Sequence, residues 1–297
     1  MKINLPSSLR GSADDPSIPS PVAAPGSEPA APGPESAALW SGSAGSGSEP
    51  PASDPGSSEP ATVAMATAAA ATVIGQVLPM YFVGDESHSM AGDPIAAVNR
   101  GLVDLRDEVA MHPLIGKKVR FGIITFADTA ETRLQLSELS EDLVLPVLAP
   151  RGRGTSYASA LEALRQTIPA DVALLKSSGY QVHRPSVFFL SDGQPTDKSD
   201  KWRARRDELK DPGFRERPNL MAFGVGDADP AVIRELASSP SYGFMMTSGA
   251  STAGAIAEFA ASMLNSMVAS AERLDRGERT IEFEKPEGFV QLDAPLL

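Results

Sequence analysis

The chain has 297 residues, a formal net charge of −12 and no cysteine. The negative balance argues against general nucleic-acid binding and against attraction to an anionic membrane, and the lack of thiols excludes disulfides, thiolate metal sites and cysteine nucleophiles. The N-terminus lacks the apolar core of a signal peptide, and the Ala-rich stretch after residue 64 is too short to span a bilayer. We therefore expect a cytoplasmic protein that is not attached to a membrane.

Composition divides the chain into unequal parts. Residues 1–64 contain 12 Pro, 14 Ser and 7 Gly, with Trp40 as their one aromatic residue, and carry a net charge of −5 that leaves −7 for the rest. Such a segment cannot bury enough apolar surface to offset the entropy lost on ordering. The predicted parts are a disordered acidic tail (1–64), a linker (65–76), one folded domain (77–272) and a C-terminal extension (273–297).

Apolar runs alternate with amphipathic patterns through the folded part. Apolar and β-branched runs predict strands at 78–84, 118–128, 131–139, 186–190, 219–225 and 243–247. Apolar residues at helical spacing predict helices from Pro94 to His112 and at 156–177, 199–210, 230–237 and 251–270. This alternation implies βαβ units, so we expect an α/β, Rossmann-like fold whose mostly parallel sheet has helices on both faces. Strand 131–139 should lie at an edge, and 279–284 alternates like a further edge strand.

Oxygen-bearing side chains follow two predicted strands and precede one predicted helix. Asp85, Ser87 and Ser89 come after the first strand, Thr155 stands just before the second helix, and Asp192 follows strand 186–190. The carboxyl ends of parallel strands meet at one edge of a sheet, where ligands bind in open α/β folds. Three hydroxyls and two carboxylates are hard donors that suit Mg²⁺ and could leave one coordination position open. The sequence therefore predicts a cation site at this edge.

The set Asp85-x-Ser87-x-Ser89, Thr155 and Asp192 resembles the metal-ion-dependent adhesion site (MIDAS) of von Willebrand factor A domains. The resemblance covers about residues 77–270. Longer stretches at 78–90, 188–197 and 222–230 are similar to the intracellular bacterial TerY-like group, which is named for tellurium resistance.

The resemblance implies a protein-binding module rather than an enzyme. Ser87 and Ser89 would bind Mg²⁺ (or Mn²⁺ or Ca²⁺) directly, Thr155 would bind it directly or through water, and the two aspartates would act mainly through waters. The open position would accept an Asp or Glu carboxylate of a protein partner. Partners implied by the family are a Ser/Thr kinase, a phosphatase or a MoxR-type ATPase, in bacterial stress response or signalling.

Two other functions stay open on the sequence alone. A Mg²⁺-dependent phosphoesterase would use the same donors to activate water. We expect Glu86 and His88 to point outward, which would leave such an enzyme without a positioned base. An extracellular adhesin is the third possibility, although no export signal supports it.

Some polar residues in this part of the chain have simpler structural interpretations. The 85–89 turn, taken alone, could cap the next helix. Asp227 and Asp229 could form a second cation site, but helix capping by Asp229 ahead of Pro230 is the favoured interpretation. Ser156 is expected to be the N-terminal residue of a helix.

Overall fold

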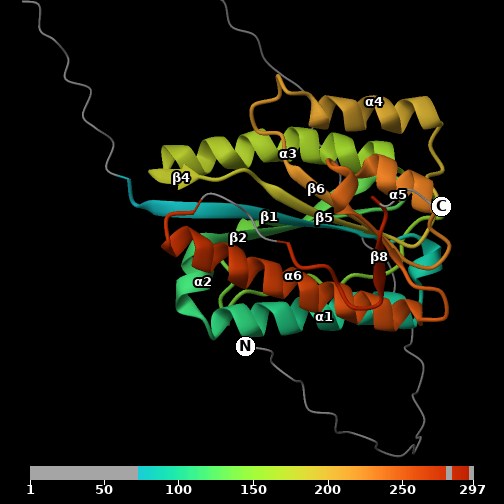
Figure 1. The fold of residues 1–297 in the computed structure, drawn as a ribbon, viewed down its shortest axis with the longest axis horizontal. Helices are drawn as coiled ribbons and strands as arrows, with labels where there is room; N and C mark the ends of the chain where they lie inside the picture. The colour runs from blue at the N-terminus through green and yellow to red at the C-terminus, as the bar shows by residue number, and fades with distance from the viewer. Residues whose placement is uncertain (1–72, 279–282, 294–297) are drawn as a thin grey trace, which may run out of the picture. The chain divides into compact units, whose positions relative to one another are not determined.

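The structure is a computed structural model that describes residues 73–278 and 283–293 (Figure 1). The predicted tail (1–64) and most of the predicted linker lie outside these residues, so the domain boundaries stay predictions. No helix within the described residues is long and apolar enough to cross a membrane.

The described residues form an eight-stranded sheet in the order β3-β2-β1-β5-β6-β7-β8, with β4 paired to the start of β1. The strands are β1 (Gly75–Asp85), β2 (Val119–Phe126), β3 (Ala130–Ser137), β4 (Tyr180–Val182), β5 (Ser186–Ser191), β6 (Asn219–Gly224), β7 (Gly243–Met246) and β8 (Phe289–Gln291). Among them, β3 and β8 run antiparallel to their neighbours and the others run parallel. The predicted mostly parallel sheet is confirmed, with β3 at an edge.

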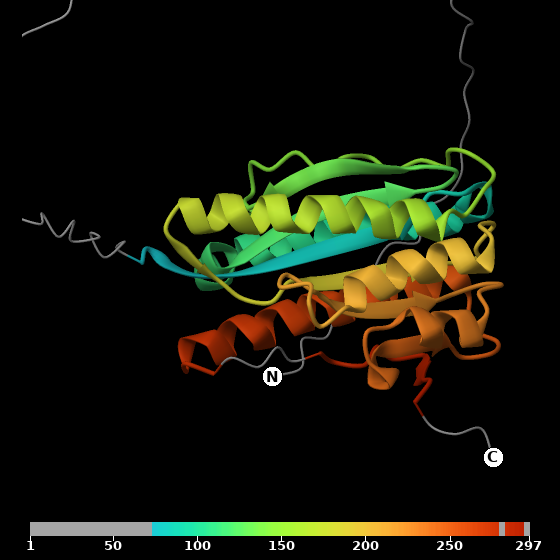
Figure 2. The same ribbon diagram turned by 90° about the horizontal axis from the view of Figure 1, so that it is seen from above.

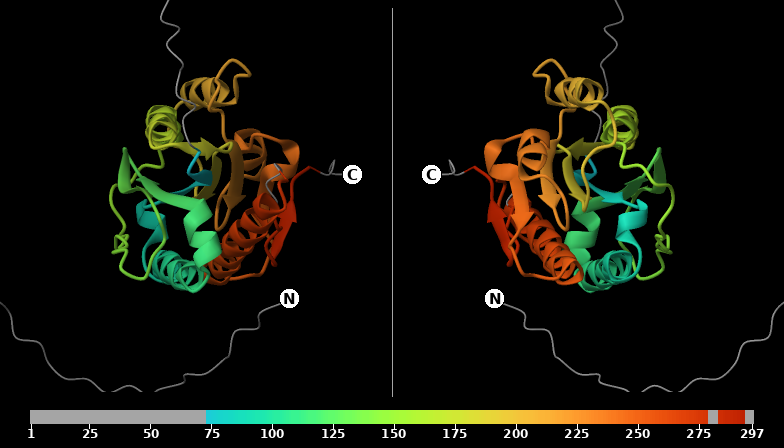
Figure 3. Two further views of the ribbon diagram at one scale, coloured as in Figure 1. Left: turned by 90° about the vertical axis from the view of Figure 1, so that its left-hand side faces the viewer. Right: turned by 90° about the vertical axis from the view of Figure 1, so that its right-hand side faces the viewer.

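Helices cover both faces of the sheet (Figures 1 and 3). One face carries α1 (Asp93–Ala110), α2 (Pro113–Lys118) and α6 (Thr252–Asp275), and the other carries α3 (Tyr157–Ser177), α4 (Ser199–Lys210) and α5 (Pro230–Leu236). Two 3₁₀ turns, η1 (His88–Met90) and η2 (Pro240–Tyr242), lie in connections. Each face has its own hydrophobic core. Strand β1 feeds both cores, since Phe82 packs into one and Tyr81 and Val83 into the other, as expected for a central strand.

Some element boundaries differ from the predicted ones. Strand β1 begins at Gly75 and α6 continues to Asp275, so both are longer than predicted. Helix α2 and strand β4 were not predicted, because six and three residues are too few to show a periodic pattern.

The segment after α6 contributes to the domain. Of the strand predicted at 279–284, residues 279–282 lie outside the described part of the chain and Phe283 and Glu284 are not in a strand. A short strand that was not predicted, β8, follows it and pairs with β7. The Phe283 ring lies 5.0 Å from the Phe244 ring, so this extension packs on the core of the domain.

The strands that directly follow β1 in sequence lie on one side of it, and the later strands β5 to β8 lie on the other side (Figure 2). After β1 the chain passes through α1 to β2 on one side, and it later returns through α3 to β5 on the other side. Ligands in open α/β sheets bind at this switch point, outside the carboxyl ends of the two strands. The β1–β5 register pairs Gly84 with Leu190, which brings Asp85 beside Ser191.

Candidate metal centre

The turn after β1 folds its hydroxyl groups toward one another. Asp85 is the last residue of β1, and its Oδ1 accepts a hydrogen bond from the Ser87 amide at 2.8 Å. The hydroxyls of Ser87 and Ser89 lie 2.9 Å apart. The Met90 amide donates to the Ser87 carbonyl at 3.0 Å, so the chain begins a 3₁₀ turn here. The alternation of donors in the sequence thus places three oxygen-bearing side chains on one side of a tight turn.

The loop after β5 completes the cluster. The Ser89 hydroxyl donates to Asp192 Oδ1 at 2.8 Å, across 103 positions of sequence. The Ser191 hydroxyl donates to Asp85 Oδ2 at 2.7 Å. The two strand ends on either side of the switch point are therefore joined by side-chain hydrogen bonds, and Ser191 is a member that the sequence did not single out. Its position as the last residue of β5 was the available signal.

Thr155 lies against the same loop. Its amide donates to the Thr196 hydroxyl at 3.0 Å, and its carbonyl accepts from the Thr196 amide at 3.0 Å. A Cβ placed on Gly193 would lie 3.6 Å from the Thr155 hydroxyl oxygen, so this hydroxyl faces the backbone next to Asp192. The structure thus brings all five predicted residues to one edge of the sheet, four through direct hydrogen bonds and Thr155 through the 193–196 loop.

The two carboxylates of the cluster are buried without a basic partner. No Lys, Arg or His among the described residues forms an ion pair with Asp85 or Asp192. Burial raises the pKa of Asp85 to about 6, against the hydrogen bonds from Ser87 and Ser191, which lower it. Burial also raises the pKa of Asp192, and the nearby charge of Asp227 adds to the shift. Ionised carboxylates in such surroundings favour the approach of a cation.

The chemistry of the donors fits a hard cation. Every side-chain donor in the cluster is an oxygen, and oxygen donors suit Mg²⁺, Mn²⁺ and Ca²⁺. No group of three or more His, Cys, Asp or Glu side chains at metal-binding spacing exists in the part of the chain that the structure describes. A metal at this edge would accordingly depend on hydroxyls as well as on the two carboxylates.

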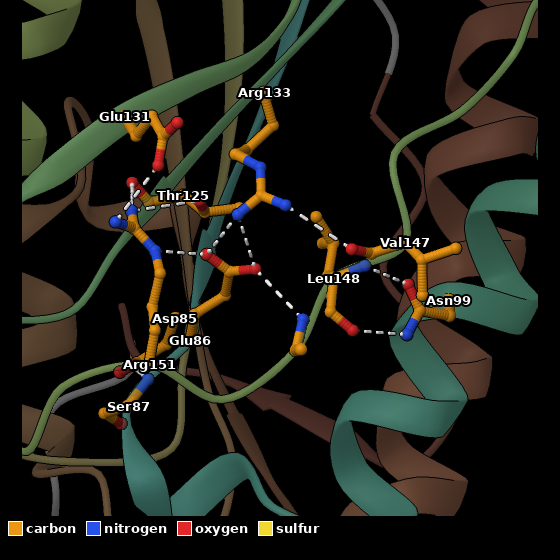
Figure 4. A network of polar contacts seen from close by, with 11 residues as sticks. Asp85, Glu86, Ser87, Asn99, Thr125, Glu131, Arg133, Val147, Leu148 and Arg151 are labelled. Atoms are coloured by element: carbon orange, nitrogen blue, oxygen red, sulfur yellow. Dashed lines mark hydrogen bonds and ion pairs between the residues drawn. The ribbon is translucent and has the colours of Figure 1, made fainter. Parts of the chain in front are cut away.

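The prediction that Glu86 points outward is wrong. Its side chain is fully buried and accepts from Arg151 Nε at 2.7 Å and from Arg133 Nη1 at 3.3 Å (Figure 4). These partners are 65 and 47 positions away, and no local pattern marks such pairings. Glu86 stands between two predicted ligands in the sequence, but its carboxylate is paired with Arg133 and Arg151.

The simpler structural interpretations of three nearby residues are confirmed. The Asp229 carboxylate accepts from the Ala231 amide at 2.8 Å and so caps α5. The Ser156 hydroxyl accepts from the Ser159 amide as the cap of α3. His88 is exposed.

The comparison with protein families identifies the domain. The family model of the von Willebrand factor type A domain matches residues 80–260, more than half of the chain. The chain therefore belongs to the von Willebrand factor type A domain family. The search of curated proteins found no match. The predicted family is confirmed, while the TerY-like subgroup stays a prediction.

The comparison with solved structures gives several matches, of which the pilus adhesin SpaC supports a shared fold. The pilus adhesin SpaC from Lactobacillus rhamnosus GG is 17% identical, with a TM-score of 0.52 over 65% of this chain and 30% of that chain. Proximal thread matrix protein 1 from the mussel byssus is 20% identical, with a TM-score of 0.45 over 66% of this chain and 47% of that one. A form of the mussel protein described as having a zinc-occupied MIDAS motif is 24% identical, with a TM-score of 0.41 over 56% and 40%. This chain spans less than half the length of these proteins.

Proposed function

We propose that this domain is a divalent-cation-dependent protein-binding module. Asp85, Ser87, Ser89, Thr155 and Asp192 would hold Mg²⁺, or Mn²⁺ or Ca²⁺ in its place, and a protein partner would add an Asp or Glu carboxylate. The observation that carries the proposal is the burial of two carboxylates that have no basic partner within residues 73–278 and 283–293 and contact serine hydroxyls at the switch point of the sheet. A buried charge without a partner is costly, and a bound cation removes that cost.

The roles of the five residues follow the family resemblance. Ser87 and Ser89 are direct ligands, Thr155 binds directly or through water, and the two aspartates act through waters. A cation held mainly by neutral hydroxyls keeps much of its positive charge, which attracts a carboxylate. The chain itself carries a net charge of −12, so an acidic partner needs such a local positive charge to bind at this edge.

Hydrolysis at the same site is less well supported than binding. A phosphoesterase needs a base within reach of the attacking water. Both carboxylate oxygens of Glu86 are engaged by arginine side chains and by the Ala149 amide, so this residue is not available as the base. The adhesin alternative gains nothing from SpaC, since 17% identity defines the fold alone.

The cellular role rests on the resemblance to the TerY-like group. We place the module in the cytoplasm, as an adaptor in a bacterial stress-response or kinase–phosphatase signalling system. A Ser/Thr kinase, a phosphatase or a MoxR-type ATPase would be the partner. Affinity capture from the native cell, with Mg²⁺ and with EDTA, tests this role, and partners retained equally in both would contradict it.

Thermal unfolding tests the metal site. A cation at one hundred times its dissociation constant stabilises the folded state by about 2.7 kcal/mol. For a domain of this size, that is a rise in Tm of about 5–10 °C. We expect Mg²⁺ to produce this rise in the unaltered chain but not in Asp85→Ala or Ser87→Ala.

The matched control is Asp229→Ala, which removes a carboxylate that caps a helix rather than one in the cluster. It should lower Tm in EDTA and keep the full Mg²⁺ response. An equal Mg²⁺ response in the unaltered chain, Asp85→Ala and Ser87→Ala would refute the site, and loss of the response in Asp229→Ala alone would move it to the 227–229 turn.

A further inference from the structure

The segment that carries Thr155 has no regular secondary structure. Residues 149–156 form neither helix nor strand, yet Thr155 is buried and stands beside the proposed metal site. An irregular segment holds a side chain in place only where its backbone is tied down by other groups. The contacts of residues 148–155 therefore decide where the Thr155 hydroxyl lies.

The start of the segment is fixed to α1. The Asn99 side chain donates from Nδ2 to the Leu148 carbonyl and accepts at Oδ1 from the Leu148 amide, each at 2.8 Å (Figure 4). This pair of hydrogen bonds satisfies both polar groups of one backbone residue. The backbone of Leu148, at the start of the segment, is therefore fixed to α1.

Glu86 is the first carboxylate that holds the segment. Its Oε1 accepts from the Ala149 amide at 3.2 Å, and its Oε2 accepts from Arg151 Nε at 2.7 Å. Its backbone carbonyl also accepts from the Arg151 amide at 2.7 Å. Arg133 donates to the same carboxylate and to the Val147 carbonyl, as Figure 4 shows. One residue of the metal-site turn is therefore bound to the Thr155 segment through both side chain and backbone.

Asp128 is the second carboxylate. Its Oδ2 accepts from the Arg153 amide at 3.1 Å and its Oδ1 from the Gly154 amide at 2.8 Å, directly before Thr155. A Cβ on Gly152 or on Gly154 would lie only 2.3 or 2.4 Å from this carboxylate. Glycine at both positions is what lets the backbone close around Asp128. The Gly152 backbone also has a φ of +73°, which L side chains rarely adopt.

We infer that Glu86 and Asp128 are positioning residues for Thr155, and that they set the metal affinity of the site without binding the metal. The inference rests on the proposed function. Arginines balance the charge of Glu86, and the Asp128 oxygens accept from the Arg153 and Gly154 amides, so both carboxylates are held against the Thr155 segment. Glu86 and Asp128 thereby fix the position of the Thr155 hydroxyl, a neutral ligand. Partners that orient metal ligands typically change metal affinity by about 10–100-fold when they are removed.

The test compares Glu86→Gln and Asp128→Asn with the unaltered chain, and Arg151→Lys serves as a milder variant in case Glu86→Gln does not fold. Mn²⁺ binding is measured by electron paramagnetic resonance, and amide hydrogen exchange is measured by NMR in EDTA. We expect Mn²⁺ dissociation constants raised about tenfold or more in Glu86→Gln and Asp128→Asn. We also expect faster exchange at the Thr155 amide without metal, which a merely stabilising role would not produce selectively.

Glu235→Gln is the matched control. Glu235 also bridges two arginines, Arg203 and Arg206, but it lies on α5 and holds no part of the Thr155 segment. It should lower stability and leave both the Mn²⁺ affinity and the Thr155 exchange rate unchanged.

The outcomes separate this inference from the proposed function. If the unaltered chain binds no Mn²⁺, the proposed metal site falls and this inference falls with it. If the unaltered chain binds Mn²⁺ and Glu86→Gln and Asp128→Asn bind it equally well, with unchanged Thr155 exchange, the metal site stands and the positioning role is overturned.

Discussion

Asp85 and Glu86 are adjacent carboxylates at the end of β1, and both are almost completely buried. Glu86 meets two arginines and a backbone amide, so the fold itself neutralises its charge. Asp85 accepts from a serine hydroxyl and an amide, and Asp192, which follows the neighbouring strand β5, accepts from the Ser89 hydroxyl. Neither is paired with a basic side chain in the part of the chain that the structure describes. Burial of a charge costs free energy unless a partner compensates it. The difference separates a carboxylate whose charge is balanced by neighbouring arginines from two that, under the proposed function, would be balanced by a bound cation.

Glu86→Gln should change the free energy of unfolding most, because it removes the carboxylate that balances two arginines. Among the described residues, Glu86→Gln leaves Arg133 without a carboxylate partner and Arg151 with Glu131 alone. Breaking a buried ion pair typically costs about 3–5 kcal/mol. The lower end is expected here, because the two arginine side chains are 24% and 29% exposed and can be partly hydrated. Urea unfolding in EDTA measures the change. A loss below about 1 kcal/mol would show that the pairing adds little to stability.

A substitution at Asp85 should change the free energy of unfolding in the opposite direction. Asp85→Asn removes an uncompensated buried charge, so in EDTA the free energy of unfolding at pH 7 should rise by about 1–2 kcal/mol. The pKa of Asp85, raised to about 6, reflects that cost, and the weaker hydrogen bonding of the amide offsets part of the gain. The same variant should lose the Mg²⁺ response. Urea unfolding with and without Mg²⁺ measures the stability change and the Mg²⁺ response. If Asp85→Asn is less stable than the unaltered chain in EDTA, the fold already compensates the Asp85 charge.

The weakest change is expected at Glu235, a partly exposed carboxylate that, like Glu86, is paired with two arginines. Hydrogen bonds from Arg203, and then from Arg206, hold the pKa of Glu235 at about 2. Because this pKa lies below that of the unfolded chain, the group contributes stability above about pH 4.5 that is lost as pH falls toward 2. The Glu235 and Arg203 side chains are partly exposed, and solvent screens their interaction, so the contribution is small. Glu235→Gln should flatten this part of the acid-unfolding curve, and an identical curve in both proteins would contradict the assignment.

Long periodic segments made most of the fold predictable. The apolar runs at β1, β2, β5 and β6 and the helical spacing in α1, α3 and α6 are carried by residues close together in sequence. Short pieces were not predictable, because α2 and β4 contain less than two turns of helix and three strand residues. The strand β8 was not predicted, since its pairing with β7 depends on how the chain returns after α6.

Local sequence patterns were enough to predict that five oxygen-bearing residues gather at one edge of a parallel sheet. Strand ends and loop positions are local properties, and the sheet topology then brings Asp85, Ser89 and Asp192 together. Which carboxylates have basic partners could be seen only from the packing of distant segments. The arginines that meet Glu86 come from β3 and from the loop before α3, and the absence of such a partner at Asp85 and Asp192, within the described residues, also depends on packing. The charge state of a buried group is set by its neighbours in space, so adjacent acids in one turn can have different roles.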